Sequence, residues 1–184
     1  GVTSKTKIFF DNCPGKIIGV TGTKGKGTTS TLIYEILKAA GKDVYLGGNI
    51  GTGVFTFLDK LTPDSWVVLE LSSFQLIDLH SSPHIAVVLM TTSEHLDWHK
   101  DTIEYQDAKA NLVKYQTQSD WVVANKDYEA TRKIANQGQG KKVWMTRHDW
   151  RGPTRLRGEH NLENIAAAAA VAKIVGISEG TVKK

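Results

Sequence analysis

The sequence has only one cysteine, Cys13, among its 184 residues. A single thiol cannot form an internal disulfide, and it excludes a zinc site built from several cysteines. Proteins of oxidising compartments commonly depend on disulfides, so this composition favours a reducing environment, and we expect a cytoplasmic protein.

Long hydrophobic runs and a strong charge excess are also lacking. No apolar stretch approaches the roughly 18–20 residues that a membrane span needs. The 23 basic and 19 acidic residues leave a net charge of only +4, and the basic residues are scattered along the chain. A nucleic-acid surface would concentrate them. We therefore expect neither a membrane nor a nucleic acid as a partner.

The sequence does contain short apolar, β-branched runs that alternate with helical patterns. Six runs are candidate strands, at residues 16–20, 44–46, 66–71, 85–90, 121–124 and 142–145. They are continuously apolar, as expected of strands covered on both faces. Helical patterns cover residues 32–40, 101–115 and 161–175. This order predicts an α/β fold with a doubly wound, mostly parallel sheet, in which ligands bind beyond the carboxyl ends of the strands.

The first strand runs into a loop of glycine, lysine and threonine that leads directly into a helix. Glycines let N–H groups turn toward an anion, the helix N-terminus adds partial positive charge, and a lysine can reach terminal phosphates. Val20 replaces the first glycine of the usual phosphate-binding pattern, and Gly27 replaces its hydroxyl residue, whose metal-binding role falls to Thr28. The alternative is a flexible turn. The candidate nucleotide-binding residues are Gly22, Thr23, Lys24, Gly25, Lys26, Gly27, Thr28 and Thr29.

A carboxylate, Glu70, lies within the apolar run at residues 66–71. Burial of a carboxylate costs free energy unless a cation compensates it. Magnesium bound to nucleotide phosphates suits this position, because Mg²⁺ takes few protein oxygens and leaves other positions to phosphate and water. The alternative is a solvated glutamate at an edge of the sheet.

Two histidines, His95 and His99, follow the fourth candidate strand and lie four residues apart. That spacing raises the possibility of a zinc site, but the H-E-x-x-H order is absent and the sequence offers no evident third ligand. The position after a strand's carboxyl end favours a functional role for His95. The alternative is a cap or a surface group.

Lys109 borders the apolar face of the helix at 101–115, because it lies four residues after Tyr105 and three before Leu112. Burial would lower the pKa of a lysine and expose a neutral amine. A neutral amine can react with CO₂ to give a carbamate, which is an anion able to bind a metal. The alternative is a lysine that extends from the apolar face into solvent.

Asn161 and Asn164 begin the alanine-rich helix and share one of its faces at a spacing of three residues. A carboxamide both donates and accepts, so this pair could bind the edge of an adenine. The alternative is a pair of helix-capping residues.

Together these segments resemble the central domain of the Mur ligase and folylpolyglutamate synthase superfamily, which has a P-loop NTPase-like fold. The resemblance extends from about residue 9 to residue 176. Within the superfamily, GGNIG at 47–51 and LELSSFQL at 69–76 are most similar to the branch that adds D-glutamate in peptidoglycan synthesis. The GKGT form of the loop is commoner in the folylpolyglutamate branch, which remains the alternative.

The resemblance implies catalytic and metal-binding roles. Lys26 and the loop amides would hold the β- and γ-phosphates of ATP. Thr28 and Glu70 would bind a first Mg²⁺. His95 and a carbamylated Lys109 would bind a second. Two metals and a lysine suit phosphoryl transfer, because the transferred group carries charge that must be neutralised in place.

The resemblance also implies substrates. Asn49, Ser72 and Gln75 would lie near the muramoyl-alanine end of UDP-N-acetylmuramoyl-L-alanine, and Asn161 and Asn164 near adenine. Phosphorylation of the terminal carboxylate would give an acyl phosphate. The amine of D-glutamate would then attack, and phosphate would leave.

Superfamily members have three domains, so the resemblance implies two further domains outside this sequence. We expect residues 1–15 to be a residual linker, residues 16–177 to be the central domain, and residues 178–184 to lead toward a C-terminal domain. The stretch 143–158 is short for the family, which predicts that a small peripheral sheet or loop is missing. We expect the isolated fragment to bind nucleotide at most and to form no amide bond, because the acceptor amine has no site.

Overall fold

The computed structural model describes residues 4–91 and 102–183. Its sheet has the strand order β2-β3-β1-β4-β5-β6, and every neighbouring pair is parallel. The predicted doubly wound, parallel sheet is confirmed, and each predicted strand overlaps one observed strand. The strands are β1 (Lys16–Thr21), β2 (Val44–Gly48), β3 (Trp66–Glu70), β4 (Ile85–Val88), β5 (Trp121–Asn125) and β6 (Lys141–Met145).

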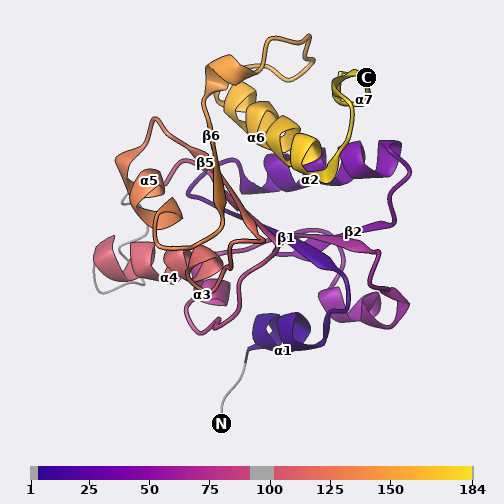
Figure 1. Cartoon of the computed structure of the whole chain (residues 1–184), viewed down its shortest axis with the longest axis vertical. Helices are drawn as coiled ribbons and strands as arrows, with labels where there is room; N and C mark the ends of the chain where they lie inside the picture. Colours follow the sequence, from indigo (N-terminus) through magenta and orange to yellow (C-terminus); the bar gives the residue numbers. More distant parts are fainter. Residues whose placement is uncertain (1–3, 92–101, 184) are drawn as a thin grey trace.

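Helices cover both faces of this sheet. Helices α2 and α6 lie on one face, and α1, α3 and α4 lie on the other (Figure 1). Three short 3₁₀ turns complete the described elements: η1 (Val54–Thr56), η2 (Leu58–Lys60) and η3 (Arg147–Asp149). The helices are α1 (Lys5–Asn12), α2 (Lys26–Ala39), α3 (Ser73–Leu76), α4 (Thr102–Lys114), α5 (Glu129–Ala135), α6 (Glu159–Val175) and α7 (Glu179–Val182).

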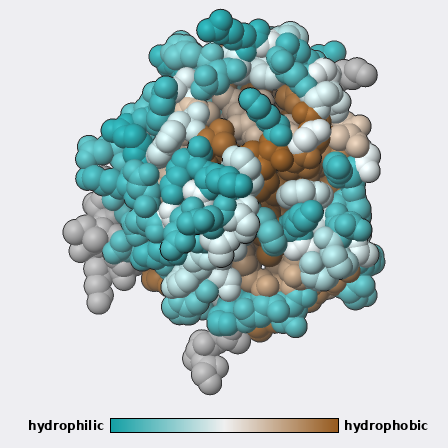
Figure 2. Space-filling model, viewed as in Figure 1, coloured by the Kyte–Doolittle hydropathy of each residue, from teal (hydrophilic) through white to brown (hydrophobic). Residues whose placement is uncertain are grey.

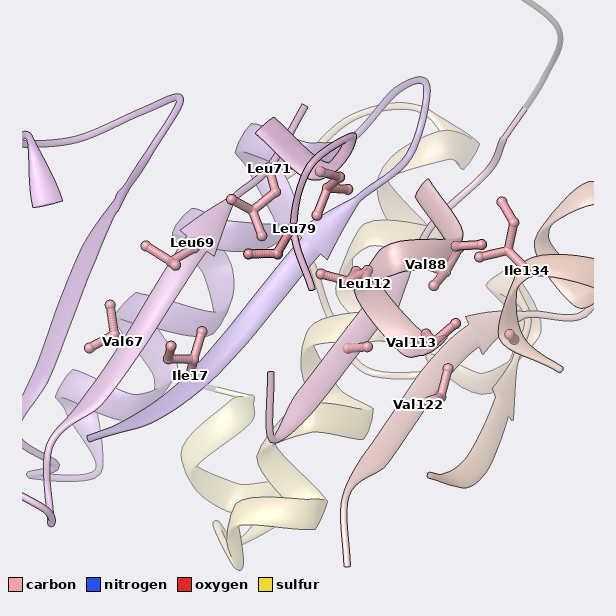
Figure 3. Packing of buried hydrophobic residues seen from close by; sticks show 14 of the residues in the cluster. Ile17, Val67, Leu69, Leu71, Leu79, Val88, Leu112, Val113, Val122 and Ile134 are labelled. Carbon is pink, nitrogen blue, oxygen red and sulfur yellow. The ribbon is translucent and has the colours of Figure 1, made fainter. Parts of the chain in front are cut away.

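Alternate strand residues build two separate cores. Ile17 and Leu69 belong to the core that also contains Leu112 of α4 (Figure 3). Ile18, Val20 and Val68 belong to the core under α2 and α6. Each fully buried side chain of this kind contributes roughly 1.5–3 kcal/mol of hydrophobic stabilisation. This alternation decides which side chains of the strand ends face α2 and which face α4.

The segment 1–15, expected to be a linker, contains helix α1. Phe9 of this helix is fully buried and packs edge-on against Phe57, with 6.0 Å between the ring centroids. Helix α1 is therefore part of the packed body, while the position of the domain boundaries stays a prediction. Helices α3 and α5 are further elements that the sequence patterns did not predict.

Strand β6 forms one edge of the sheet. Apolar residues gather in a hollow beside helix α6 (Figure 2). The cavity there has a volume of about 570 Å³, and its walls include Trp144, Trp150 and Ile177. Part of its wall comes from the stretch 143–158, in which a small peripheral sheet or loop was predicted to be missing.

Candidate functional site

The loop between β1 and α2 is shaped by glycines. Gly25 precedes the first residue of α2 and has a φ of 84°, in the left-handed region that favours glycine. A Cβ at this position would lie 2.2 Å from Oδ1 of Asn164. The first N–H groups of α2 have no carbonyl partner within the helix, so the loop and the helix start form a ready anion site.

Glu70, the last residue of β3, lies beside this loop. Val68 faces α2, so Glu70, two residues later, faces the same way. Its side chain is 6% exposed, and its Oε2 lies 3.2 Å from the place that a Cβ on Gly27 would occupy. No ion pair joins Glu70 to a lysine or arginine within residues 4–91 and 102–183. A buried carboxylate in this state fits a bound cation.

Lys26 folds back over its own loop. Its Nζ donates hydrogen bonds to the carbonyl oxygens of Gly22, at 3.1 Å, and Thr23, at 3.3 Å. Lys26 is the first residue of α2, and Glu70 lies against the next residue, Gly27, so the structure places both candidates at the start of this helix.

Lys109 reaches the loop from the other face of the sheet. Its Nζ donates to the carbonyl oxygen of Gly22 at 3.1 Å and to Oγ1 of Thr21 at 3.3 Å. The residue is 1% exposed, so of the two interpretations that the sequence left open, burial is correct and an extension into solvent is not. Burial, together with the smaller effect of the nearby charge of Lys26, lowers the pKa of Lys109 to about 7.

The two helix-capping candidates hold α6 against the loop. Oγ1 of the buried Thr29 donates to Oδ1 of Asn164 at 3.2 Å. Nδ2 of Asn164 donates to Oδ1 of Asn161 at 3.0 Å, and Nδ2 of Asn161 donates to the carbonyl oxygen of Arg157 at 2.7 Å. These contacts give both asparagines a structural role. The metal-binding candidate Thr28 lies exposed at the start of α2.

The substrate candidates lie after β2 and β3. The backbone N–H of Asn49 donates to the carbonyl oxygen of Glu70 at 2.9 Å, and Asn49 is exposed. The N–H and Oγ of Ser72 both donate to Oε1 of Gln75, at 2.9 and 3.0 Å, and cap α3. Gln75 also lines a cavity of about 300 Å³ together with Gly48.

His95 and His99 lie outside the described residues, so the second metal site stays a prediction. Within the part of the chain that is described, no three histidine, cysteine, aspartate or glutamate residues cluster as metal ligands.

A cleft of about 410 Å³ opens next to the loop and holds residues that the sequence analysis missed. The hydroxyl of Tyr128 donates to Oε1 of Glu163 at 3.0 Å, and Arg147 pairs with Glu159 at 2.7 Å. Glu163 directly precedes the candidate Asn164 on the first turns of α6, and this position was the signal in the sequence that could have indicated a role for Glu163. Its partner Tyr128 is 35 residues away, beyond the reach of local patterns.

The parallel sheet and the glycine- and lysine-rich loop after its central strand define a P-loop-type α/β domain. A family model described as the Mur ligase middle domain matches residues 20–151, and the chain belongs to this family. This agrees with the resemblance seen in the sequence.

Curated relatives share substantial identity with the chain. It is 41% identical to the UDP-N-acetylmuramoylalanine–D-glutamate ligase of Clostridium kluyveri over 193 residues, which cover 94% of this chain and 42% of the relative. The enzyme of the same name from Clostridium botulinum is 38% identical over 188 residues, covering 91% and 41%. The chain therefore spans about two fifths of the length of these relatives. The alignment with the Clostridium kluyveri enzyme spans 193 residues, which is more than the 184 residues of this chain. The Clostridium kluyveri enzyme therefore contains residues that this chain lacks.

Solved structures share the fold. The MurF ligase of Thermotoga maritima in complex with ADP gives a TM-score of 0.74 at 21% identity, covering 97% of this chain and 50% of that one. FolC of E. coli in complex with DHPP and ADP gives 0.67 at 18% identity, covering 97% and 58%. At these identities the likeness shows the architecture alone. Separately, none of the described helices has the length and apolarity to cross a membrane.

Proposed function

We propose that this chain is the ATP-binding central domain of a ligase that joins D-glutamate to UDP-N-acetylmuramoyl-L-alanine. The observation that carries this proposal is the carboxylate of Glu70, buried beside Gly27 at the start of α2. A carboxylate without a cationic partner costs free energy in such a place, and a metal ion on the phosphates would compensate it.

The residues present fit a magnesium–nucleotide complex. The loop amides and Lys26 would bind the terminal phosphates, after Lys26 exchanges its two carbonyl partners for phosphate oxygens. Thr28 and Glu70 would hold the metal. Bound Mg²⁺ neutralises charge on the transferred phosphoryl group. Lys26 would add a positive charge beside the phosphates, which favours phosphorylation of the substrate carboxylate.

Lys109 would contribute a second anion after modification. Its pKa of about 7 leaves a large neutral fraction at pH 7, and a neutral amine attacks CO₂ to form a carbamate with release of one proton. The carbamate and His95 would hold a second Mg²⁺. The burial of Lys109 supports this proposal, because it disfavours the ammonium form.

The proposed substrates are supported by the activity of the relatives and by the motifs at residues 47–51 and 69–76. Asn49, Ser72 and Gln75 would lie near the muramoyl-alanine end, and the cavity beside Gln75 supports this placement. The reaction would take place in the cytoplasm. Separate N- and C-terminal domains would bind the uridine nucleotide and D-glutamate, so we expect this chain alone to form no amide bond.

Two alternatives remain. A folylpolyglutamate synthase-type ligase is favoured by the GKGT sequence at residues 25–28. A module that binds nucleotide without catalysis is the second. Supplying the full-length protein with ATP and either substrate pair distinguishes them. Phosphate release with UDP-N-acetylmuramoyl-L-alanine and D-glutamate supports the proposal, whereas release only with a folate and L-glutamate contradicts it.

Nucleotide binding by the chain is tested by titrating it with a non-hydrolysable ATP analogue and Mg²⁺. Lys26→Ala should weaken binding by about 10- to 100-fold, because a hydrogen bond to a charged group is worth roughly 1.5–3 kcal/mol. Lys38→Ala is the matched control, since it removes an exposed lysine from the far end of the same helix. Equal binding by the two variants would contradict the role of Lys26.

A further inference from the structure

The cleft beside the loop offers a way to choose between nucleobases. We propose that Glu163, held in place by Tyr128, selects a base with an exocyclic amino group, such as adenine, and disfavours one with an oxygen there. The inference rests on the proposed binding of a nucleoside triphosphate at the loop.

Glu163 occupies the correct place for this role. Lys24 and Gly25 of the loop and Glu163 of α6 line the same cleft of about 410 Å³. The contact between Gly25 and Asn164 fixes the start of α6 against the loop. A nucleotide whose phosphates lie on the loop would thus place its nucleoside against the first turns of α6.

The neighbouring asparagines are less available as base readers. The Asn161 oxygen accepts from Asn164, the Asn164 oxygen accepts from Thr29, and each amide already donates one N–H. Asn164 lines the cleft, whereas Asn161 does not. A carboxamide has a limited number of donors and acceptors, so these contacts restrict what the pair can offer a base.

The two glutamates of the cleft differ in their availability. The carboxylate of Glu159 pairs with Arg147 at 2.7 Å, and its side chain is 78% exposed. Glu163 is half-buried and uses Oε1 to accept from Tyr128. Within the described residues, its Oε2 accepts no hydrogen bond. Glu163 therefore presents a free acceptor to the cleft.

Tyr128 keeps this acceptor in a fixed orientation. Tyr128 lies at the start of α5 and Glu163 on α6, so the 3.0 Å hydrogen bond joins two separate elements. Burial raises the pKa of Tyr128 to about 12, and the hydrogen bond to Glu163 contributes to the rise. The hydroxyl thus stays protonated and donates to Oε1 throughout the physiological pH range, which leaves Oε2 for the ligand.

The selectivity follows from hydrogen-bond chemistry. An ionised carboxylate only accepts, so it pairs with the amino group on C6 of adenine. Hypoxanthine carries an oxygen at C6. This oxygen and the carboxylate oxygen would face each other as two acceptors with no hydrogen between them. Such a mismatch costs roughly 10-fold in affinity or more.

The test compares the affinities of the chain for ATP and inosine triphosphate, each with Mg²⁺ and under conditions without turnover. The wild-type protein should prefer ATP by at least about 10-fold. Glu163→Gln should reduce that preference by about 10-fold, because an amide can turn its N–H group toward the oxygen. Tyr128→Phe keeps the ring, loses the donor and should reduce the preference to a smaller extent.

Glu159→Gln is the matched control, since it removes the same charge from an exposed position one turn earlier on α6. It should keep the wild-type preference. An unchanged preference in Glu163→Gln, or an equal loss in Glu159→Gln, overturns the inference. Equal affinity of the wild type for both nucleotides does so as well. Thermal melting of each variant verifies that it is folded.

Lys26→Ala separates this inference from the proposed function. Binding that depends on Lys26 but shows no preference between the bases removes the role of Glu163 and leaves the phosphate site intact. A wild-type protein that binds neither nucleotide removes the proposed function, and the base selection falls with it.

Discussion

Lys26 and Lys109 donate hydrogen bonds to the same atom, the carbonyl oxygen of Gly22, each at 3.1 Å. One lysine comes from α2 and the other from α4, on opposite faces of the sheet. Two ammonium groups on one oxygen repel each other, and this repulsion adds to burial in lowering the pKa of Lys109.

The lowered pKa of Lys109 predicts a pH-dependent stability. Between pH 7 and about 10.4, the unfolded chain keeps the proton that the folded chain has released, so the free energy of unfolding rises with pH. From pH 7 to pH 9 this group should add about 2 kcal/mol. Urea unfolding in CO₂-free buffer should show this rise in the wild type and its loss in Lys109→Met.

Lys114→Met is the control for that series, because it removes an exposed lysine from the end of the same helix. It should keep the wild-type slope. Parallel pH profiles for the wild type and Lys109→Met would show that the buried amine has an ordinary pKa.

Gly25→Ala should destabilise the protein by about 2 kcal/mol or more, through left-handed backbone strain and a clash with Asn164. Gly41→Ala provides the comparison, since its φ of 72° carries the same strain but nothing lies within 4 Å of the added Cβ. That variant should lose only about 1 kcal/mol. Equal losses in chemical denaturation would remove the close contact between the loop and α6.

Glu70→Gln should have opposite effects with and without ligand. Without nucleotide, the variant should be as stable as the wild type or up to about 2 kcal/mol more stable, because it no longer buries an unpaired charge. With Mg²⁺ and an ATP analogue, it should lose most of the increase in melting temperature that the wild type shows.

Glu35→Gln, an exposed change on α2, should behave like the wild type in both conditions. If Glu70→Gln keeps the full magnesium-dependent increase, Glu70 does not bind the metal.

Phe9→Ala tests whether α1 belongs to the folded body. Deleting a fully buried ring should cost about 3 kcal/mol or more of unfolding free energy. Ile8→Ala changes a side chain that is 39% exposed, and it should cost less than about 1 kcal/mol. A negligible loss for Phe9→Ala, measured by urea denaturation, would support the expectation that residues 1–15 form a linker.

The sheet could be predicted because its strands are buried on both faces and are therefore continuously apolar. Helix α1 could not, since its sequence KTKIFFDN has a weak apolar stripe and its stability comes from the contact between Phe9 and Phe57. Loop chemistry indicated Lys26, whereas the spacing to Leu112 placed Lys109 at the border of the apolar face and could not decide between burial and extension into solvent.

Other parts of the site depend on contacts between distant segments. A spacing of three residues places Asn161 and Asn164 together, but it does not reveal that they bond to each other and to Thr29. The pairing of Tyr128 with Glu163 joins two helices and leaves no periodic signal. The prediction for His95 stays untested.

The alternation of side chains along β1 and β3 also sets a limit on how this domain can evolve. Thr21 contacts the amine of Lys109 on the α4 side of the sheet, whereas the carboxylate of Glu70 lies on the α2 side. Inserting one residue into either strand would invert every side chain beyond it and send the reactive groups to the wrong layers. Length changes are consequently confined to the connections, while the strands that end at the loop must keep a constant residue count.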